Sequence, residues 1–240
     1  MLEQYRAEDI LFVDIETVPQ YSDFVQVPEN LQEFWDKKSA YFRKEGQTAQ
    51  DAYERAGIYA EFGKIICISA GIIVHRGGQR MFRVKSFYGH DEKIILSEFS
   101  KMLAAFTSDA SKNLCGHNAK EFDFPYISRR MLIHGLKLPQ ILDVAGKKPW
   151  DVKFLDTLDL WKFGDYKNYT SLGLLTAIFG IPSPKDDIDG SQVAQVYYHE
   201  NDLERIVVYC EKDVLATAQL FLRFKGEPLL DPINLERVLV

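Results

Sequence analysis

The chain has 240 residues, is 46% hydrophobic and carries a formal net charge of −6. Its length suits one large domain better than two, and its acidic balance argues against a protein that coats nucleic acid through bulk electrostatics. No segment reaches the ~18 uninterrupted apolar residues needed to cross a bilayer, so we expect no membrane association.

The first part of the chain predicts a strand, a helical insertion and a hairpin. Residues 9–15 form an apolar run rich in strand-forming residues, which predicts a buried strand. From about residue 20 to residue 63 the apolar residues recur at helical spacing, so we expect a helical insertion. Residues 64–74 and 81–88 are predicted as two further strands, and the glycine-rich turn between them favours an antiparallel pair.

The rest of the chain alternates helices with short strands. One strand is expected to end near residues 115–117 and another to cover 152–156; helices are expected from 91 to 106, through 126–131, and around 172–179, 192–198 and 203–224. Three strands in a meander, followed by strands that return through helical crossovers, predict a mixed five-stranded sheet with helices on its faces. We expect an α/β fold in which residues 1–240 form a single domain.

The cysteines indicate a compartment. Cys67, Cys115 and Cys210 are odd in number, widely spaced and set in apolar surroundings. Such residues are typical of reduced thiols in a protein core, so we expect a cytoplasmic protein.

Two acidic residues lie at the end of the first predicted strand at a spacing that suits metal binding. Asp14 and Glu16 are two positions apart, so in a strand both side chains point to the same side. Burying two carboxylates without partners would cost several kcal/mol. An isolated Asp-x-Glu is nonetheless most often a strand-end acid followed by a solvated glutamate, and only other segments can favour a site.

A second segment has the pattern Asn118-x-x-x-Phe122-Asp123, where an apolar strand turns into a helix. Asparagine is favoured in such a turn for structural reasons alone. Asp123 also suits the first turn of a helix, where the helix dipole stabilises an acid. Taken alone, this segment leaves the structural and the functional interpretation equally open.

A third segment places an acid on the inner face of a helix. Tyr209 and Asp213 are four residues apart, so they stand one above the other on the predicted helix. Their neighbours on that face are Ile206 and Ala216, both apolar, which indicates that the face points inward. An aspartate directed at a core is unfavourable unless it is paired or bound to a metal ion.

Together these segments resemble the three exonuclease motifs of the DEDD superfamily, in its tyrosine-bearing (DEDDy) branch. The similarity is strongest to the proofreading exonuclease domain of family B DNA polymerases, here as a stand-alone bacterial protein, and it covers about residues 9 to 224. The segments that carry it are Phe12-Val13-Asp14-Ile15-Glu16-Thr17, Asn118-x-x-x-Phe122-Asp123-x-Pro125-Tyr126-Ile127 and Tyr209-Cys210-x-x-Asp213.

The resemblance implies an RNase H-like fold and a set of site residues. Asp14, Glu16 and Asp213 would hold one metal ion, Asp14 would bridge to a second, and Asp123 would support that second ion. Tyr209 would orient the attacking water. The residues that would lie along the substrate are Thr17, Asn118 and Phe122. Oxygen ligands of this kind suit Mg²⁺ or Mn²⁺ better than zinc, and two such ions can stabilise both the attacking and the leaving oxygen of a phosphodiester.

We therefore expect a metal-dependent 3′-5′ exonuclease that releases nucleoside 5′-monophosphates from single-stranded DNA. The same chemistry on RNA or short oligoribonucleotides is the nearest alternative, because a preference for the 2′-hydroxyl depends on pocket shape. A non-catalytic nucleic-acid-binding module with the same fold is the other alternative. The sequence does not assign a role to the insertion at about 20–63, an oligomeric state or a protein partner.

Overall fold

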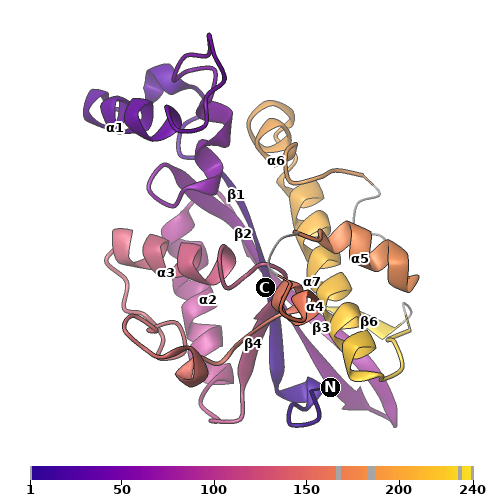
Figure 1. The fold of residues 1–240 in the computed structure, drawn as a ribbon. Coiled ribbons are helices and arrows are strands. Elements are labelled where there is room, and N and C mark those ends of the chain that lie inside the picture. The colour runs from indigo at the N-terminus through magenta and orange to yellow at the C-terminus, as the bar shows by residue number, and fades with distance from the viewer. Residues whose placement is uncertain (1, 166–168, 183–186, 232–233, 239–240) are drawn as a thin grey trace.

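The first strand, β1 (Ile10–Pro19), lies inside a six-stranded mixed sheet flanked by helices (Figure 1). In this computed structural model the strand order is β5-β4-β1-β2-β3-β6. Adjacent strands β1, β2 and β3 pair antiparallel, whereas β4 and β5 run parallel to β1, and β6 runs parallel to β3. The remaining strands are β2 (Gly63–Arg76), β3 (Gln79–Tyr88), β4 (Asn113–Gly116), β5 (Phe154–Asp156) and β6 (Leu235–Arg237). The structure describes all residues except 1, 166–168, 183–186, 232–233 and 239–240.

The helices cover both faces of this sheet. They are α1 (Glu29–Ser39), α2 (Glu92–Phe106), α3 (Asp123–Ile133), α4 (Thr157–Lys162), α5 (Leu172–Phe179), α6 (Val193–Gln195) and α7 (Leu203–Lys225). Short 3₁₀ turns are η1 (Ala7–Asp9), η2 (Phe24–Gln26), η3 (Tyr53–Ile58) and η4 (Pro149–Asp151), and a single π-helical turn, η5, covers Val196–Glu200. Within the described part of the chain, no helix combines the length and the hydrophobicity needed to span a membrane.

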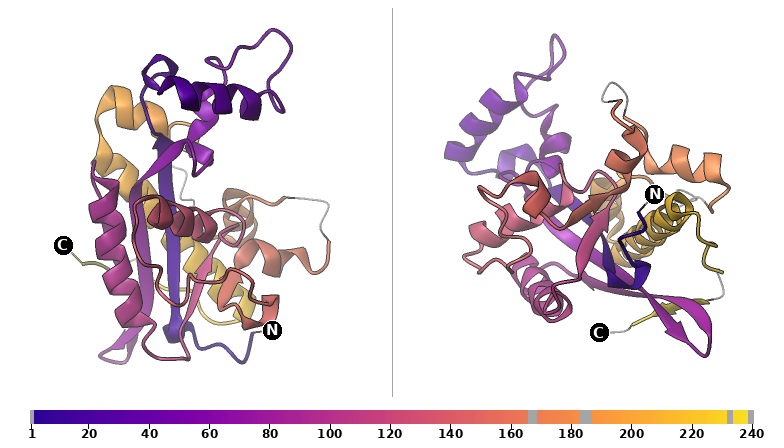
Figure 2. Two further views of the ribbon diagram at one scale, coloured as in Figure 1. Left: turned by 90° about the vertical axis from the view of Figure 1, so that its left-hand side faces the viewer. Right: turned by 60° about the horizontal axis from the view of Figure 1, so that its bottom comes forward.

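The alternation of side chains along β1 decides which helix each residue meets. Leu11, Val13 and Ile15 belong to the core shared with α2 and α3. Ile10 and Phe12 point the other way and pack with residues of α7. Figure 2 shows α2 and α7 on opposite sides of the sheet. Since strand residues alternate between faces, the acidic positions that continue the even-numbered series face α7.

The predicted α/β class, with its mixed sheet and flanking helices, is confirmed, but the sheet has six strands and not five. The additional strand, β6, has three residues and pairs with residues 82–84 of β3. It is mostly exposed and so carries no alternation of buried and exposed residues that a sequence pattern could reveal. Backbone pairing with β3 and ion pairs of Glu236 with Arg76 and Arg83 hold it to the sheet edge.

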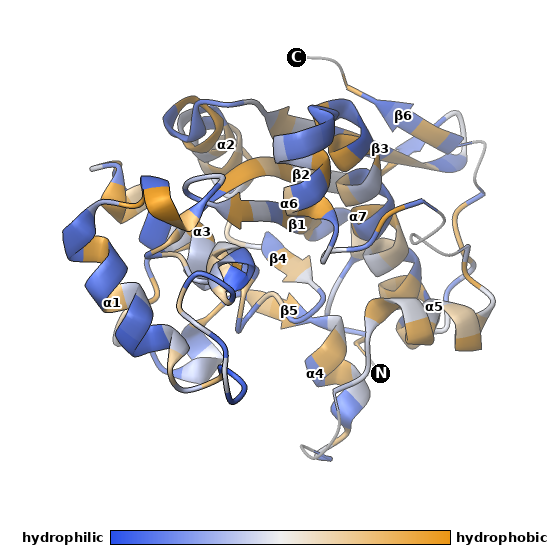
Figure 3. Ribbon diagram, turned by 90° about the horizontal axis from the view of Figure 1, so that it is seen from above, coloured by the Kyte–Doolittle hydropathy of each residue, from blue (hydrophilic) through white to orange (hydrophobic). Residues whose placement is uncertain are grey.

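The expected helical insertion lies between β1 and β2 and contains η2, α1 and η3. It projects beyond the ends of these strands (Figure 1). Its centre is Trp35, which is fully buried and donates from its indole nitrogen to the carbonyl oxygen of Ala49 at 2.8 Å. The buried residues around it are Val27, Ala52, Tyr53, Ala56 and Phe62. The outer helix α1 is mostly hydrophilic (Figure 3), so the insertion has a small core of its own beneath a polar surface.

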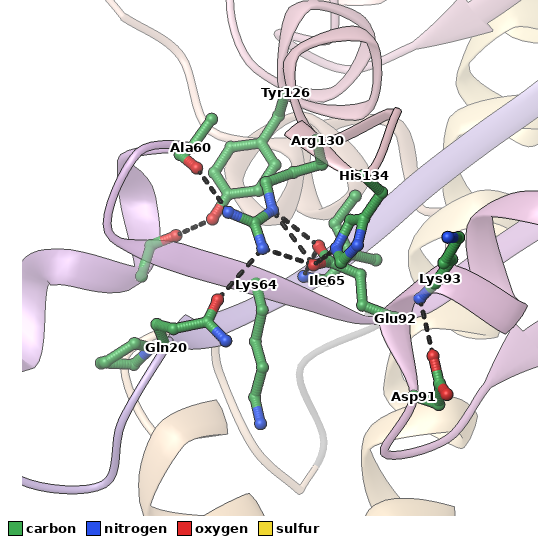
Figure 4. A network of polar contacts seen from close by, with 12 residues as sticks. Gln20, Ala60, Lys64, Ile65, Asp91, Glu92, Lys93, Tyr126, Arg130 and His134 are labelled. Carbon is green, nitrogen blue, oxygen red and sulfur yellow. Dashed lines mark hydrogen bonds and ion pairs between the residues drawn. The ribbon is translucent and has the colours of Figure 1, made fainter. Parts of the chain in front are cut away.

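A buried ionic network joins the insertion to the sheet and to α3 (Figure 4). The guanidinium of Arg130 binds both carboxylate oxygens of Glu92 and donates to the carbonyl oxygen of Ala60 at 2.9 Å and to Oε1 of Gln20 at 3.0 Å. Glu92 also accepts from the backbone nitrogen of Ile65 at 2.7 Å. Arg130 and Glu92 are only 4% and 6% exposed, so each charge depends on the other for compensation.

Candidate active site

The first motif lies on β1 with both carboxylates directed toward α7. Glu16 is buried, with 7% of its surface exposed, and Asp14 is partly buried. The pairing of β1 with β2 shifts register between Glu16 and Thr17, which marks a β-bulge. Bulges are common beside active sites, because the extra residue redirects a side chain. Here the irregularity falls directly after the second carboxylate.

The second motif lies close to β1 because glycine at position 116 lets the backbone approach Val13 and Ala119. A Cβ atom on Gly116 would lie 2.3 Å from Cβ of Ala119 and 3.0 Å from the carbonyl oxygen of Val13, so only glycine fits there. Asn118 then adopts a left-handed conformation with φ of 63°, as the turn interpretation of this residue predicts. The chain next enters α3, whose first residue, Asp123, accepts a hydrogen bond from the backbone nitrogen of Ile15 at 3.1 Å. Asp123 therefore docks between the two acidic positions of β1.

Asp156 holds the loop of the second motif in place. Its carboxylate accepts hydrogen bonds from the backbone nitrogens of Asn118 at 2.9 Å and Lys120 at 3.0 Å. It also caps α4 by accepting from the nitrogen of Leu158 at 2.9 Å, and it is only 2% exposed. Asp156 is thus a structural acid that positions the segment leading to Asp123.

The third motif lies on α7, on the face that packs against β1. Tyr209, Cys210 and Asp213 are all buried, and the Tyr209 hydroxyl is hydrogen-bonded to Asp213. The thiol of Cys210 lies 3.3 Å from Oδ2 of Asp14 and 3.5 Å from its carbonyl oxygen. The sequence indicated only a reduced core thiol at Cys210. Its place inside the third motif, one residue after Tyr209, was the available signal that it would reach the carboxylates.

Burial and the neighbouring charges raise the pKa of two of the carboxylates, Asp14 and Asp123. Burial, followed by the charges of Asp213, Asp123 and Glu16, raises the pKa of Asp14 well above its ordinary value. Burial is also the main cause that raises the pKa of Asp123 to about 7. Like charges held together in this way disfavour ionisation unless a cation lies among them. The structure therefore brings Asp14, Glu16, Asp123, Tyr209 and Asp213 into one electrostatically coupled cluster.

The chemistry of the donors fits a hard divalent cation. Among the described residues, a carboxylate oxygen of Asp14, one of Glu16 and the sulfur of Cys210 lie within 4.8 Å of one another. Burial and the neighbouring thiol of Cys67 raise the pKa of Cys210 well above its ordinary value, so the thiol stays protonated and donates to Asp14. A protonated thiol is a poor metal ligand, which leaves a set of oxygen donors suited to Mg²⁺ or Mn²⁺.

A cleft of about 660 Å³ opens beside Glu16. Thr17 and Phe122, two of the three residues expected along the substrate, also line it. The described residues that line this cleft do not include Asn118, whose observed contribution is the turn before α3. Its carbonyl oxygen accepts from the backbone nitrogen of Phe122 at 3.0 Å, so Asn118 helps to orient a residue of the cleft wall.

The coupled carboxylates predict that the metal-free protein loses stability as the pH rises. The pKa of Asp123 is about 7 in the folded protein and near 4 in the unfolded chain. Between these values the unfolded chain binds fewer protons than the folded protein, so the free energy of unfolding falls, by on the order of 2 kcal/mol between about pH 5 and pH 7. Thermal unfolding in EDTA across this range would measure it. The pH dependence should flatten in Asp123→Asn, and stability that rises with pH in EDTA would contradict the expectation.

The sequence was also compared with known protein families. Residues 58–228 match a family described as predicted 3′-5′ exonucleases related to the exonuclease domain of PolB. The match spans most of the chain and includes the second and third motifs, whereas the first motif and most of the insertion precede it. Exonuclease domains of this type are metal-dependent, and the acidic cluster around Asp14 and Glu16 offers ligands for a cation. The chain therefore belongs to this family of 3′-5′ exonucleases and is an enzyme whose substrate is a nucleic acid.

Proposed function

We propose that the protein removes nucleotides one at a time from the 3′ end of single-stranded DNA and releases nucleoside 5′-monophosphates, using two Mg²⁺ or Mn²⁺ ions. The observation that carries this proposal is the buried cluster in which carboxylates from β1, α3 and α7 lie close together, so that burial and the neighbouring charges raise the pKa of Asp14 and of Asp123. The family's relation to a DNA polymerase exonuclease domain favours DNA over RNA. When bound, the ions would neutralise the carboxylates and stabilise the attacking and leaving oxygens of the phosphodiester.

The carboxylates divide between two positions. Asp14, Glu16 and Asp213 would hold one ion, since they approach one another from β1 and α7. Asp14 would also face the second ion, with support from Asp123. The hydrogen bond from the nitrogen of Ile15 keeps one oxygen of Asp123 directed at β1, so Asp123 would act from a fixed position. The Cys210 thiol would orient Asp14 in a similar way.

Tyr209 would orient the attacking water without removing its proton. Burial, followed by the charges of Asp213 and Glu16, raises the pKa of the Tyr209 phenol far above its ordinary value. The hydroxyl therefore stays protonated at any working pH and serves as a hydrogen-bonding group. Its bond to Asp213 holds it beside the carboxylates, where it can position a water molecule for attack on the scissile phosphorus.

Replacing Tyr209 with phenylalanine is expected to lower kcat by about 10²-fold or more while leaving metal affinity within a few-fold of the wild type. The reason is that the hydroxyl orients water but supplies no ligand in this scheme, and a misplaced reacting group costs about 10²-fold. Isothermal titration with Mn²⁺ and initial rates on the same preparation would separate the two effects. Equal losses of affinity and rate would assign Tyr209 to the metal site itself.

The direct test of the proposed function is time-resolved digestion of a 5′-labelled single-stranded DNA oligomer with Mg²⁺. A ladder that shortens from the 3′ end, and that is absent in EDTA and in Asp213→Ala, is the expected result. A matched RNA oligomer tests the substrate class. Faster shortening of the RNA would show that RNA, and not DNA, is the preferred substrate. If neither oligomer is hydrolysed with Mg²⁺ or Mn²⁺, the proposal is overturned.

Two further expectations belong to the same proposal. We infer that residues 1–240 act as a single exonuclease domain, because the insertion and α7 both contact β1. We also place the protein in the reducing cytoplasm, since Cys67, Cys115 and Cys210 are buried and free.

A further inference from the structure

We propose that the helical insertion forms one wall of the nucleotide cleft and that Ile58 and Arg55 on this wall bind the 3′-terminal segment of the single strand. Ile58 would pack against a base or sugar, and Arg55 would pair with a backbone phosphate. The proposal rests on the proposed function, and it gives the insertion a role in substrate binding.

The cleft is built from segments that are far apart in the sequence. The end of β1 supplies Glu16, Thr17 and Pro19. The turn η3, which belongs to the insertion, supplies Arg55 and Ile58. The residues that line the cleft include Glu16, Glu54, Arg55, Ile58 and Phe122. Its volume of about 660 Å³ lies within the usual range for small-ligand sites, so it has room for a nucleotide beside Glu16, one of the clustered carboxylates.

Close packing fixes the wall against the catalytic elements. The hydroxyl of Tyr126 on α3 donates to the carbonyl oxygen of Gly57 at 2.8 Å. The ring of Tyr126 in turn packs against that of Phe122, with their centroids 5.4 Å apart. A Cβ atom on Gly57 would come within 3.0 Å of the backbone of Val18, so η3 lies directly on β1. The wall is therefore held to the two elements that carry Glu16 and Asp123.

Ile58 presents an apolar side chain where a base could lie. It is 47% exposed, although the two residues before it, Ala56 and Gly57, are buried. Phe122 offers a second apolar surface to the same cleft from the segment before α3. Apolar and aromatic side chains bind bases of any identity, because every base has a hydrophobic face. This arrangement suits an enzyme that shortens strands irrespective of sequence.

Arg55 supplies the positive charge that a phosphate needs. Among the described residues that line the cleft it is the only cationic one, and Glu16 and Glu54 are the acidic ones. Its guanidinium carbon lies 4.5 Å from the centre of the Phe42 ring, which orients the side chain from within the insertion. Arg55 lies in the insertion and precedes the part of the chain that matches the exonuclease family.

The test compares Arg55→Met with Lys44→Met. Methionine keeps an apolar stem over Phe42 while it removes the charge, and Lys44 is an exposed cation of the same insertion that does not line the cleft. Binding is measured by fluorescence anisotropy with a 5′-fluorescein oligothymidylate that carries phosphorothioate linkages at its 3′ end, in Mg²⁺ at several salt concentrations. Initial rates on the unmodified oligomer give kcat and KM.

Arg55→Met is expected to raise Kd and KM about tenfold, with kcat changed much less, because a charged hydrogen bond is lost from the bound strand. The slope of log Kd against log salt should fall by about 0.7, the value for one phosphate contact on a single strand. Ile58→Ala should weaken binding several-fold with the salt slope unchanged, and Ile58→Leu should restore it. Lys44→Met should match the wild type.

Two outcomes separate this proposal from the proposed function. If the wild type shortens the oligomer from its 3′ end while Arg55→Met and Ile58→Ala both match Lys44→Met in Kd and salt slope, the wall does not bind substrate and the exonuclease assignment stands. If the wild type neither binds nor shortens DNA or RNA, the proposed function is overturned and the role of the wall with it.

Discussion

Replacing Asp14 with asparagine is expected to reduce exonuclease turnover by more than about 100-fold and, at the same time, to raise the melting temperature of the metal-free protein. Losses of about 10–100-fold follow changes to residues that only support a metal ligand, so losing the carboxylate that we propose to be shared between two ions should exceed them. The stabilisation arises because a neutral amide removes a charge that is disfavoured first by burial and then by the charges of Asp213, Asp123 and Glu16, the causes that raise the pKa of Asp14.

The two effects are measured on one preparation. Initial rates on a single-stranded oligomer with Mg²⁺ give the loss of turnover, and thermal unfolding in EDTA at about pH 8 gives the gain in stability, expected to be on the order of 1 kcal/mol. Asp143→Asn is the matched control, since Asp143 is exposed and lies outside the carboxylate cluster. Turnover that survives in Asp14→Asn, or a lower melting temperature without metal, would show that Asp14 does not have this place in the cluster.

Replacing Arg130 with methionine is expected to lower the free energy of unfolding by about 3–5 kcal/mol, the usual result of removing one partner from a buried ion pair. Glu92 would remain 6% exposed without its main counter-charge, and the carbonyl oxygen of Ala60 would lose its donor. His134, whose Nε2 lies 2.6 Å from Glu92 Oε2, would keep one polar contact to that carboxylate but could not replace the bidentate guanidinium.

Urea unfolding followed by circular dichroism would measure the effect. Arg129→Met changes the neighbouring residue on the same helix, and because Arg129 is exposed the expected change is within about 0.5 kcal/mol. A loss below about 1 kcal/mol in Arg130→Met would mean that the network contributes specificity of packing rather than stability.

The local pattern of the sequence was sufficient for most of the elements, though not for β6, and for placing the acidic residues on their strand and helices. The helix expected at 203–224 is observed as α7, Leu203–Lys225, because a long amphipathic segment has a periodicity that tertiary contacts reinforce. The alternation along β1 likewise predicted that Asp14 and Glu16 share one face. The resemblance of the three motifs to an exonuclease family agrees with the family match found over residues 58–228.

Contacts between distant segments were decided only by the tertiary structure. The thiol of Cys210 reaches Asp14 across 196 positions of sequence, and the guanidinium of Arg130 reaches Gln20 across 110. Gly57 and Tyr126 join the insertion to α3 in the same way. Periodicity and motif spacing describe neighbours along one element. The partners of a buried charge and the residues that line a cleft depend instead on which elements fold against each other. For this reason the acidic residues and the elements that carry them could be predicted from the sequence, whereas the position of η3 beside Glu16 could not.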